Sequence, residues 1–218
     1  MNNPILAKQF EPSFPLERIE SKTIHRQKVR LAKREIRDLR RKQSAADALE
    51  GFDREIEIYG FTKGQFSVVD LLQESLRITG KAALTVSTWT AAQTDVSTVI
   101  DFVESGFCDS ARWLVDLTFQ RRSPELAQRI RDAFGADAIR VGKNHAKFFM
   151  IRNNEWDVIC QTSMNLNFNP RFENFSIRND PGLCDFHQTI FDEIWRNQKR
   201  TMATARPYEI QKHFLNEM

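Results

Sequence analysis

Strand-like segments alternate with helix-like segments along most of this chain, and that rhythm constrains its fold more than any other feature. Apolar and β-branched runs, as at 82–87, are separated by amphipathic runs, as at 66–78. Strands separated by helices need crossover connections, which give parallel pairing and place helices on the faces of the sheet. The sequence therefore predicts an α/β fold with a mostly parallel sheet flanked by helices.

The rhythm changes after Gly142. Segments 146–152 and 156–162 both have strand-like patterns, and a polar turn of three residues joins them. A connection this short joins antiparallel strands, whereas parallel strands need a long crossover. The hairpin makes the predicted sheet a mixed one, and a terminal helix is expected after it over 186–199.

The expected domain organisation has four parts. They are an extended, proline-containing arm over 1–20, a basic helix over 21–50, the α/β domain over 51–200 and a tail over 201–218. No apolar run approaches the roughly 18 residues that a membrane span requires. The first residues lack the charged-then-apolar order of a signal peptide, so a cytoplasmic location is expected.

The net charge of +3 conceals an asymmetry. Residues 22–42 hold ten Lys or Arg against two acidic residues, a net charge of +8. Helix-forming residues dominate from 21 to 49, and neither Pro nor Gly occurs there before Gly51. These properties predict a long basic helix in front of the domain.

Two interpretations of this basic segment stay open. It is either a solvated helix that packs or dimerises, or an electrostatic attachment to nucleic acid, because counterion release from phosphates needs mainly charge density. A membrane surface is a weaker alternative, since few large apolar side chains are present to insert. The candidate nucleic-acid-binding residues are Arg26, Arg30, Lys33, Arg34, Arg37, Arg40 and Arg41.

The three cysteines, Cys108, Cys160 and Cys184, are scattered and form no C-x-x-C pair. The expected state is a reduced, buried thiol at each position. No His, Cys and carboxylate residues have the spacing of metal ligands. We therefore expect no metal site and no cofactor.

The hairpin carries the candidate catalytic residues. His145 and Lys147 are two apart, so on a strand both side chains project from one face. Ser163 and Asn165 are also two apart at the end of the partner strand, and Glu173 follows. The hairpin brings these groups to one end of the sheet, where they form a phosphate pocket that contains a nucleophile.

This pattern resembles the signature of the phospholipase D superfamily. The family pattern is H-x-K, four residues, D, then G-S-x-N and a later acidic segment. The chain has H-A-K at 145–147, T-S-M-N at 162–165 and E-N at 173–174, at the family's spacing. The resemblance covers roughly residues 55–198, includes the strand and helix order, and implies a phospholipase D-like fold.

Two positions depart from the family pattern. Arg152 stands where the family has Asp, and Thr162 stands where it has Gly. The resemblance implies that the family's Asp supports the site while His and Lys perform the chemistry. Its replacement therefore bears on catalytic competence, and Asp157 is a candidate to take its place.

The resemblance implies a metal-independent phosphodiesterase reaction. His145 attacks phosphorus to form a phosphohistidine, and a second imidazole protonates the leaving oxygen and then activates water. Lys147 and Asn165 hold the non-bridging oxygens, Ser163 donates a hydrogen bond to the same phosphate, and Glu173 orients His145.

A single H-x-K occurs in the chain. The other histidines, His25, His187 and His213, have no lysine two residues later. The second imidazole is therefore expected from a second subunit, in a two-fold homodimer that places two copies of His145 face to face.

Three functions stay open. The first is a nuclease or other phosphodiesterase held on DNA or RNA, the second a catalytically degenerate nucleic-acid-binding protein, and the third a phospholipid-acting phosphodiesterase. Trp89 is either a packing residue or a base-stacking platform. Arg121 and Arg122 either contact phosphate or belong to a solvated loop.

Overall fold

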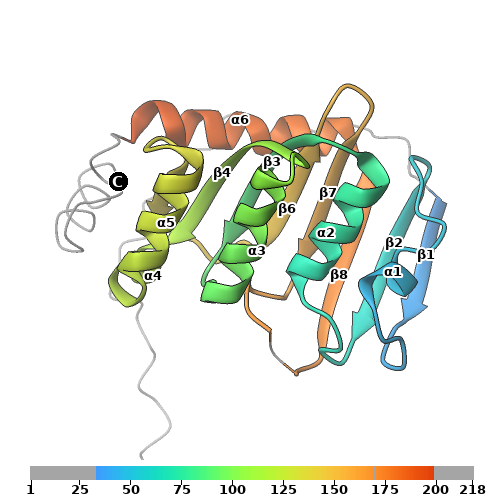
Figure 1. The fold of residues 1–218 in the computed structure, drawn as a ribbon. Coiled ribbons are helices and arrows are strands. Elements are labelled where there is room, and N and C mark those ends of the chain that lie inside the picture. Colours follow the sequence, from blue (N-terminus) through green and yellow to red (C-terminus); the bar gives the residue numbers. More distant parts are fainter. Residues whose placement is uncertain (1–32, 169, 199–218) are drawn as a thin grey trace, which may run out of the picture.

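The computed structural model describes residues 33–168 and 170–198, which form one sheet with helices on both of its faces (Figure 1). The elements in chain order are β1 Lys33–Asp38, α1 Ala45–Ala48, β2 Ile56–Thr62, α2 Val68–Thr79, β3 Ala82–Thr88, α3 Gln93–Glu104, β4 Cys108–Asp116, α4 Leu117–Arg122, α5 Pro124–Phe134, β5 Ile139–Gly142, β6 Phe148–Arg152, β7 Asp157–Thr162, β8 Glu173–Asn179 and α6 Pro181–Asn197.

The sheet is mixed, as predicted. Its eight strands lie in the order β1-β2-β8-β7-β6-β3-β4-β5. The β1–β2, β3–β4 and β4–β5 pairs are parallel, and the four pairs between β2 and β3 are antiparallel. Six strands therefore share one direction, while β6 and β8 run against them, because the hairpin and its continuation into β8 are inserted between the two parallel parts.

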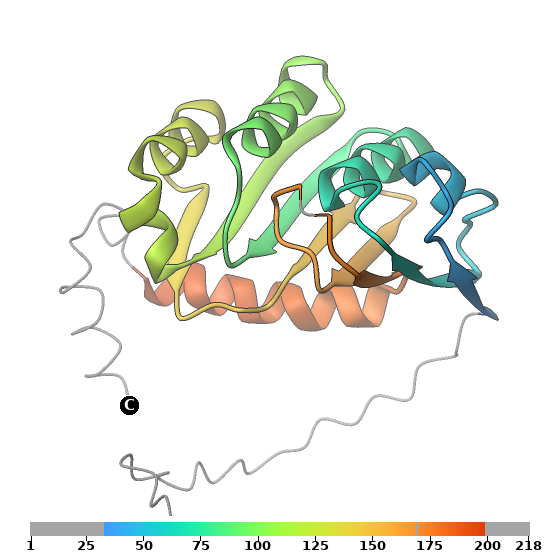
Figure 2. The ribbon, with the colours of Figure 1, turned by 90° about the horizontal axis from the view of Figure 1, so that it is seen from below.

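Helices cover the two faces of the sheet unequally. Helices α1 to α5 lie on one face and α6 lies alone on the other, where it does not extend beneath β1 and β2 (Figure 2). The larger core packs between the sheet and α1 to α5. The smaller core, which includes Phe148, Met150 and Ile159, packs against Phe191 of α6. The part of the sheet that α6 leaves open exposes Ile36 and Tyr59.

Local sequence accounts for several element boundaries. Ser67 and Asp70 form a reciprocal capping box at the start of α2, and Pro124 occupies the first turn of α5, where its missing N–H costs nothing. A side chain at Gly60 would collide with the Phe175 ring and with Leu39. Glycine at this position lets β2 lie close to the aromatic core.

The strands and helices from residue 56 onward occur in the predicted order, with boundaries shifted by a few residues. The hairpin of β6 and β7 is confirmed, with Arg152 opposite Asp157 beside the turn. Helix α4 was not predicted, because the apolar pattern of 112–118 continues from the strand into it. Its start is fixed by the Asp116 side chain, which accepts a hydrogen bond from the Thr118 N–H at 2.9 Å.

The predicted basic helix over 21–50 is wrong for its second half. Residues Lys33–Asp38 form β1, an edge strand in parallel register with β2, and helix α1 is only four residues long. Backbone pairing with β2 and burial of Leu39 outweigh the helix propensity of this segment, which amounts to a few tenths of a kcal/mol per residue. Residues 21–32, the arm over 1–20 and the tail over 201–218 lie outside the described residues.

All three cysteines are buried and unbridged, as predicted. Burial raises the pKa of the Cys108 thiol to about 11 and that of the Cys184 thiol to about 12. Both thiols are therefore poor nucleophiles near neutral pH. Among the described helices, none has both the length and the apolar character needed to cross a membrane.

Candidate active site

The predicted site residues lie at one edge of the sheet, the lower edge in Figure 1 and the edge facing the viewer in Figure 2. Strands β2, β3, β4, β5 and β7 end at this edge, and the oppositely directed β6 and β8 begin there. His145 and Lys147 precede β6, Ser163 and Asn165 follow β7, and Glu173 opens β8. The fold therefore brings together the three parts of the motif.

His145 and Lys147 project from the loop between β5 and β6 rather than from within β6. The Lys147 carbonyl nevertheless accepts a hydrogen bond from the Thr162 N–H at 3.0 Å, which extends the β6–β7 ladder by one step. The Lys147 Nζ lies 3.3 Å from His145 Nδ1 and 3.1 Å from the His145 carbonyl oxygen. Imidazole and ammonium groups thus meet at one point, and the His145 side chain is exposed.

Asn144 anchors the loop between β5 and β6 to the neighbouring strands. It is buried, and its amide nitrogen donates to the carbonyl oxygens of Thr88 at 3.2 Å and Leu114 at 3.1 Å. Its side-chain oxygen accepts from the Ala146 N–H at 3.2 Å. These bonds anchor the two residues that flank His145 to the ends of β3 and β4. Nothing in the spacing of the motif pointed to Asn144, although a polar residue directly before H-x-K is the signal that was available.

Ser163 and Glu173 form the other half of the site. The Ser163 hydroxyl donates to the Glu173 carboxylate and accepts from the Asn174 N–H at 3.0 Å. The Ser163 N–H donates to the Asn174 carbonyl at 3.0 Å. These contacts join the ends of β7 and β8 and hold the hydroxyl at the edge. Among the described residues no hydrogen bond joins Glu173 to His145, so within one chain Glu173 orients Ser163.

Lys147 is under two opposing electrostatic influences. Partial burial lowers the pKa of its amine, and the carboxylate of Glu173 raises it, with burial the larger effect. Lys147 is therefore in contact with His145 and within the electrostatic influence of Glu173. An incoming phosphate would replace Glu173 as the main compensating charge for Lys147.

Asn165 is half-buried behind Ser163, and its side-chain oxygen is buried without a hydrogen-bond partner in the described part of the chain. A buried amide oxygen normally has a partner, so an unpaired one is typical of a site that binds a ligand or water. This oxygen is an acceptor and cannot bind a phosphate oxygen, so the predicted contact of Asn165 with phosphate falls to its amide N–H groups and stays a prediction.

The two departures from the family signature do not disturb this edge. Arg152 lies at the far end of β6, where its guanidinium donates to Asp157 at 2.6 Å and to Asp185 of α6 at 2.7 Å. Asp157 therefore compensates Arg152 instead of serving the site. The Thr162 hydroxyl donates to the Asn174 carbonyl at 2.8 Å and accepts from the Met164 N–H at 3.0 Å, so it supports the turn that carries Ser163.

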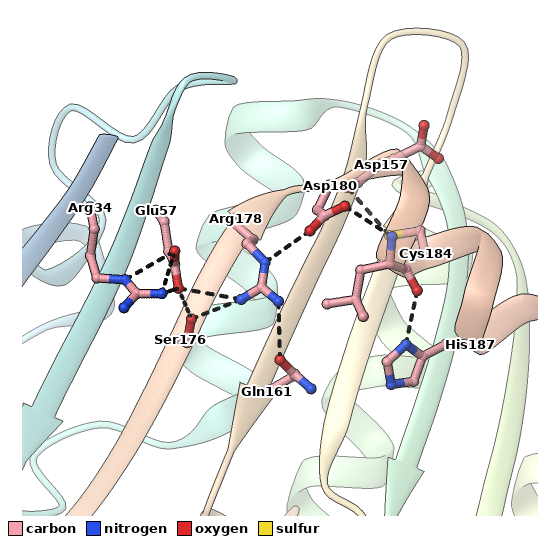
Figure 3. A network of polar contacts seen from close by, with 10 residues as sticks. Arg34, Glu57, Asp157, Gln161, Ser176, Arg178, Asp180, Cys184 and His187 are labelled. Carbon is pink, nitrogen blue, oxygen red and sulfur yellow. Dashed lines mark hydrogen bonds and ion pairs between the residues drawn. The ribbon is translucent and has the colours of Figure 1, made fainter. Parts of the chain in front are cut away.

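The predicted nucleic-acid-binding residues do not form one cationic helix face. Figure 3 shows Arg34 in contact with Glu57, which also accepts from Ser176 and Arg178. Arg37 is bound to Glu35 and to the Ala48 carbonyl, and Arg40 pairs with Asp38.

Lys33 and Arg41 are exposed and have no ion-pair partner among the described residues, while Arg26 and Arg30 lie outside them. Three of the predicted contacts with phosphate are therefore already occupied by carboxylates of the protein.

The sequence left open whether Trp89 and Arg122 take part in the site, and both lie beside His145 or in contact with a residue that does. The Trp89 and His145 ring centroids are 5.9 Å apart, and the Arg122 guanidinium lies over the Trp89 ring at 4.6 Å. Trp89 is only half-buried, so it borders the site instead of filling the core. Within the described ranges, no group of three or more His, Cys, Asp or Glu residues could hold a metal ion.

No family model matches the chain, and no curated protein matches it by sequence. Solved structures do match. A polyphosphate kinase from Porphyromonas gingivalis superposes with a TM-score of 0.52 at 15% identity, over 74% of this chain and 30% of the kinase. The chain has a phospholipase D-like fold.

Two further matches have lower TM-scores. Nuc, a phospholipase D family member from Salmonella typhimurium, gives 0.49 at 15% identity, over 66% of this chain and 95% of Nuc. A phosphatidylserine synthase from Haemophilus influenzae gives 0.46 at 14% identity, over 73% of this chain and 44% of the synthase. At such identities the likeness shows the fold alone, and this chain spans about a third of the length of the polyphosphate kinase.

Proposed function

We propose that this protein is a metal-independent phosphodiesterase that cleaves nucleic acid through a phosphohistidine at His145. The proposal is carried by one observation, the meeting of an exposed imidazole, an ammonium group and a carboxylate-bound hydroxyl at the carboxyl edge of a phospholipase D fold. These groups supply a nucleophile, a cation and a hydrogen-bond donor for one phosphate. The phospholipase D fold itself is one that hosts chemistry at phosphodiester groups.

The reaction follows from the roles of these groups. An imidazole nitrogen of His145 attacks phosphorus, the bond to the leaving oxygen breaks, and a second imidazole gives that oxygen its proton. The second imidazole then takes a proton from water, whose oxygen attacks phosphorus and releases His145. Lys147 and Asn165 stabilise the charge on the non-bridging oxygens, and Ser163 turns its single hydroxyl proton from the Glu173 carboxylate to the same phosphate.

The second imidazole is proposed to come from another copy of the chain. An exposed aromatic surface beside the site supports this arrangement: the rings of Phe61 and Phe172 stack at 5.7 Å, and both are exposed. Phe61 is opposite Asn174, whose backbone bonds Ser163. A two-fold contact through this surface, on the sheet face that α6 leaves open, would bring two site edges together.

The test of turnover is cleavage of labelled single- and double-stranded DNA in excess EDTA. The wild type is expected to cleave, and His145→Ala to lose activity by at least about a thousandfold, because the nucleophile is absent. His187→Ala is the matched control, since His187 bonds the Leu183 carbonyl within α6 and packs against Phe148 of the smaller core, with no hydrogen bond or ring contact to His145 or Ser163 in the described part of the chain. Equal activity of the wild type and His145→Ala would refute the mechanism.

The test of the dimer is the activity of mixtures of wild type and His145→Ala after subunit exchange. If each site uses two copies of His145, an equal mixture retains about a quarter of the wild-type activity, and if each chain acts alone it retains about a half. Phe61→Glu is expected to lower both dimer content in sedimentation and activity. A linear dependence on the wild-type fraction would show that the second imidazole has another source.

The second candidate function is nucleic-acid binding without catalysis. It is suggested by Arg152 and Thr162, the two departures from the family pattern. Arg152 is bound by two carboxylates at the opposite end of β6, and Thr162 supports the site turn. These contacts favour an active site over a degenerate one. Salt-sensitive DNA binding without cleavage, by wild type and His145→Ala alike, would reverse that preference.

A further inference from the structure

A second concentration of positive charge lies next to the candidate site. A cavity of about 470 Å³ opens between the starts of α3 and α5. Its lining residues are Ala91, Ala92, Gln93, Arg122, Ser123, Pro124, Glu125, Leu126 and Arg129. The volume lies within the range of small-molecule pockets, and Arg122 and Arg129 supply cations to it.

The two cavity arginines differ from most others in the described part of the chain. Nine arginines there form ion pairs with carboxylates: Arg34, Arg37, Arg40, Arg54, Arg77, Arg112, Arg140, Arg152 and Arg178. Arg122 and Arg129 form no ion pair among the described residues, although Glu125 also lines the cavity. Their charge is therefore available to an anionic ligand.

Arg122 is held in place rather than extended into solvent. Its guanidinium donates to the Thr118 hydroxyl at 2.7 Å and lies over the Trp89 ring. Thr118 in turn donates to Asp116 at 2.6 Å, and the other Asp116 oxygen accepts from the Asn144 N–H at 3.2 Å. Asp116 thus connects the helix that carries Arg122 with the loop that carries His145, and the two positions are fixed relative to one another.

We propose that Trp89, Arg122 and Arg129 form a subsite for the nucleotide next to the scissile phosphodiester, with Trp89 as the base platform and the arginines as ligands of the adjacent phosphate. The inference rests on the proposed function and extends it by naming the substrate as a nucleic-acid strand. A single-diester phospholipid has no second phosphate for these cations, and base–aromatic stacking accounts for a half-exposed tryptophan beside the nucleophile. The starts of α3 and α5 add positive potential to the cavity.

The test is equilibrium binding of a short fluorescent single-stranded DNA, measured by anisotropy in the His145→Ala background so that no cleavage occurs. Arg122→Gln combined with Arg129→Gln is expected to raise the Kd about tenfold or more. The slope of log K against log salt is expected to shrink by about 0.7, because contact with one phosphate is lost. Arg77→Gln is the control, since Arg77 pairs with Glu74 near the end of α2 and lies outside this cavity.

A second arm compares turnover in the otherwise wild-type chain. The double variant should lose at least about ten times more kcat/KM on the oligonucleotide than on bis(p-nitrophenyl) phosphate, which has a single diester. A Kd within about twofold of the parent, with an unchanged salt slope, would overturn the subsite. The subsite would also be overturned if the double variant lost more affinity for phosphatidylglycerol vesicles than for DNA.

The two proposals fail in different ways. Absent cleavage by the chain with His145 intact, together with weaker DNA binding by the double variant, would refute the proposed reaction and keep the subsite. Cleavage that depends on His145, with DNA binding unaffected by the double variant, would keep the reaction and refute the subsite.

Discussion

Two groups of arginines at opposite sides of this molecule have different surroundings. In the network of Figure 3, Arg34 and Arg178 both bind the carboxylate of Glu57, which is 5% exposed. At the cavity beside the site, Arg122 and Arg129 have no carboxylate partner among the described residues. The first group joins β1 to β2 and β8, and the second group lines a cavity between the starts of α3 and α5.

The difference teaches that the density of arginine along the chain is a poor guide to ligand binding. The basic segment is the most charged part of the sequence, yet Arg34, Arg37 and Arg40 are compensated within the fold. A cation that already has a buried or bidentate carboxylate partner gains little from an external phosphate, since it must first give up that partner. Uncompensated cations near a nucleophile are the better indicator.

The largest expected effect is that of Glu57→Ala on stability. The change leaves Arg34 and Arg178 facing each other without their shared carboxylate, and we expect a loss of about 3 kcal/mol in the free energy of unfolding. Urea denaturation followed by circular dichroism measures it. Glu57→Gln, which keeps hydrogen-bond acceptance, should lose less. A loss below about 1 kcal/mol for Glu57→Ala would mean that the network adds little to the sheet.

Arg152→Asp comes next and tests the departure from the family pattern. It restores the family's residue type but places a third carboxylate beside Asp157 and Asp185. We expect a loss of about 2 kcal/mol in stability and no gain in kcat, because Arg152 lies at the far end of β6 from His145. Arg152→Gln removes the positive charge without adding a negative one, so it separates the loss of Arg152 from the repulsion among carboxylates. A rise in kcat for Arg152→Asp would show that this position acts on the site.

The pH dependence of activity tests the cation at the site itself. Burial lowers the pKa of Lys147, so its positive charge is present below that pKa and is lost, as pH rises, earlier than for an ordinary lysine. We expect kcat/KM to fall about tenfold per pH unit above this point. Lys147→Arg should move the alkaline limb to higher pH while lowering the plateau. An alkaline limb that is identical in both proteins would assign the titration to another group.

The smallest expected effect is that of Arg34→Gln. The Arg34 side chain is 58% exposed, so its pair with Glu57 is screened by water, and Arg178 continues to compensate the carboxylate. We expect a loss of less than about 1 kcal/mol in stability and no change in the Kd for single-stranded DNA. Loss of DNA affinity comparable with that of the Arg122 and Arg129 variant would erase the distinction between the two groups.

Much of the domain could be predicted because it depends on local patterns. Strand and helix order after residue 56 follows from apolar periodicity, and the mixed sheet follows from the short turn between β6 and β7. The pairing of that hairpin also brings the H-A-K segment to the T-S-M-N segment. The helix predicted over the basic segment failed where pairing with β2 outweighed intrinsic propensity at Lys33–Asp38.

The sequence by itself determined which elements form and which chemical groups meet at the carboxyl edge, since both depend on periodicity and on short spacings. Only the tertiary structure decided which charges are compensated, because Glu57 reaches Arg34 and Arg178 across three strands. Likewise, only the packed fold places Asn144 under the His145 loop and Arg122 over Trp89. These contacts join residues that no local pattern connects, so they appear only once the strands have their order and register.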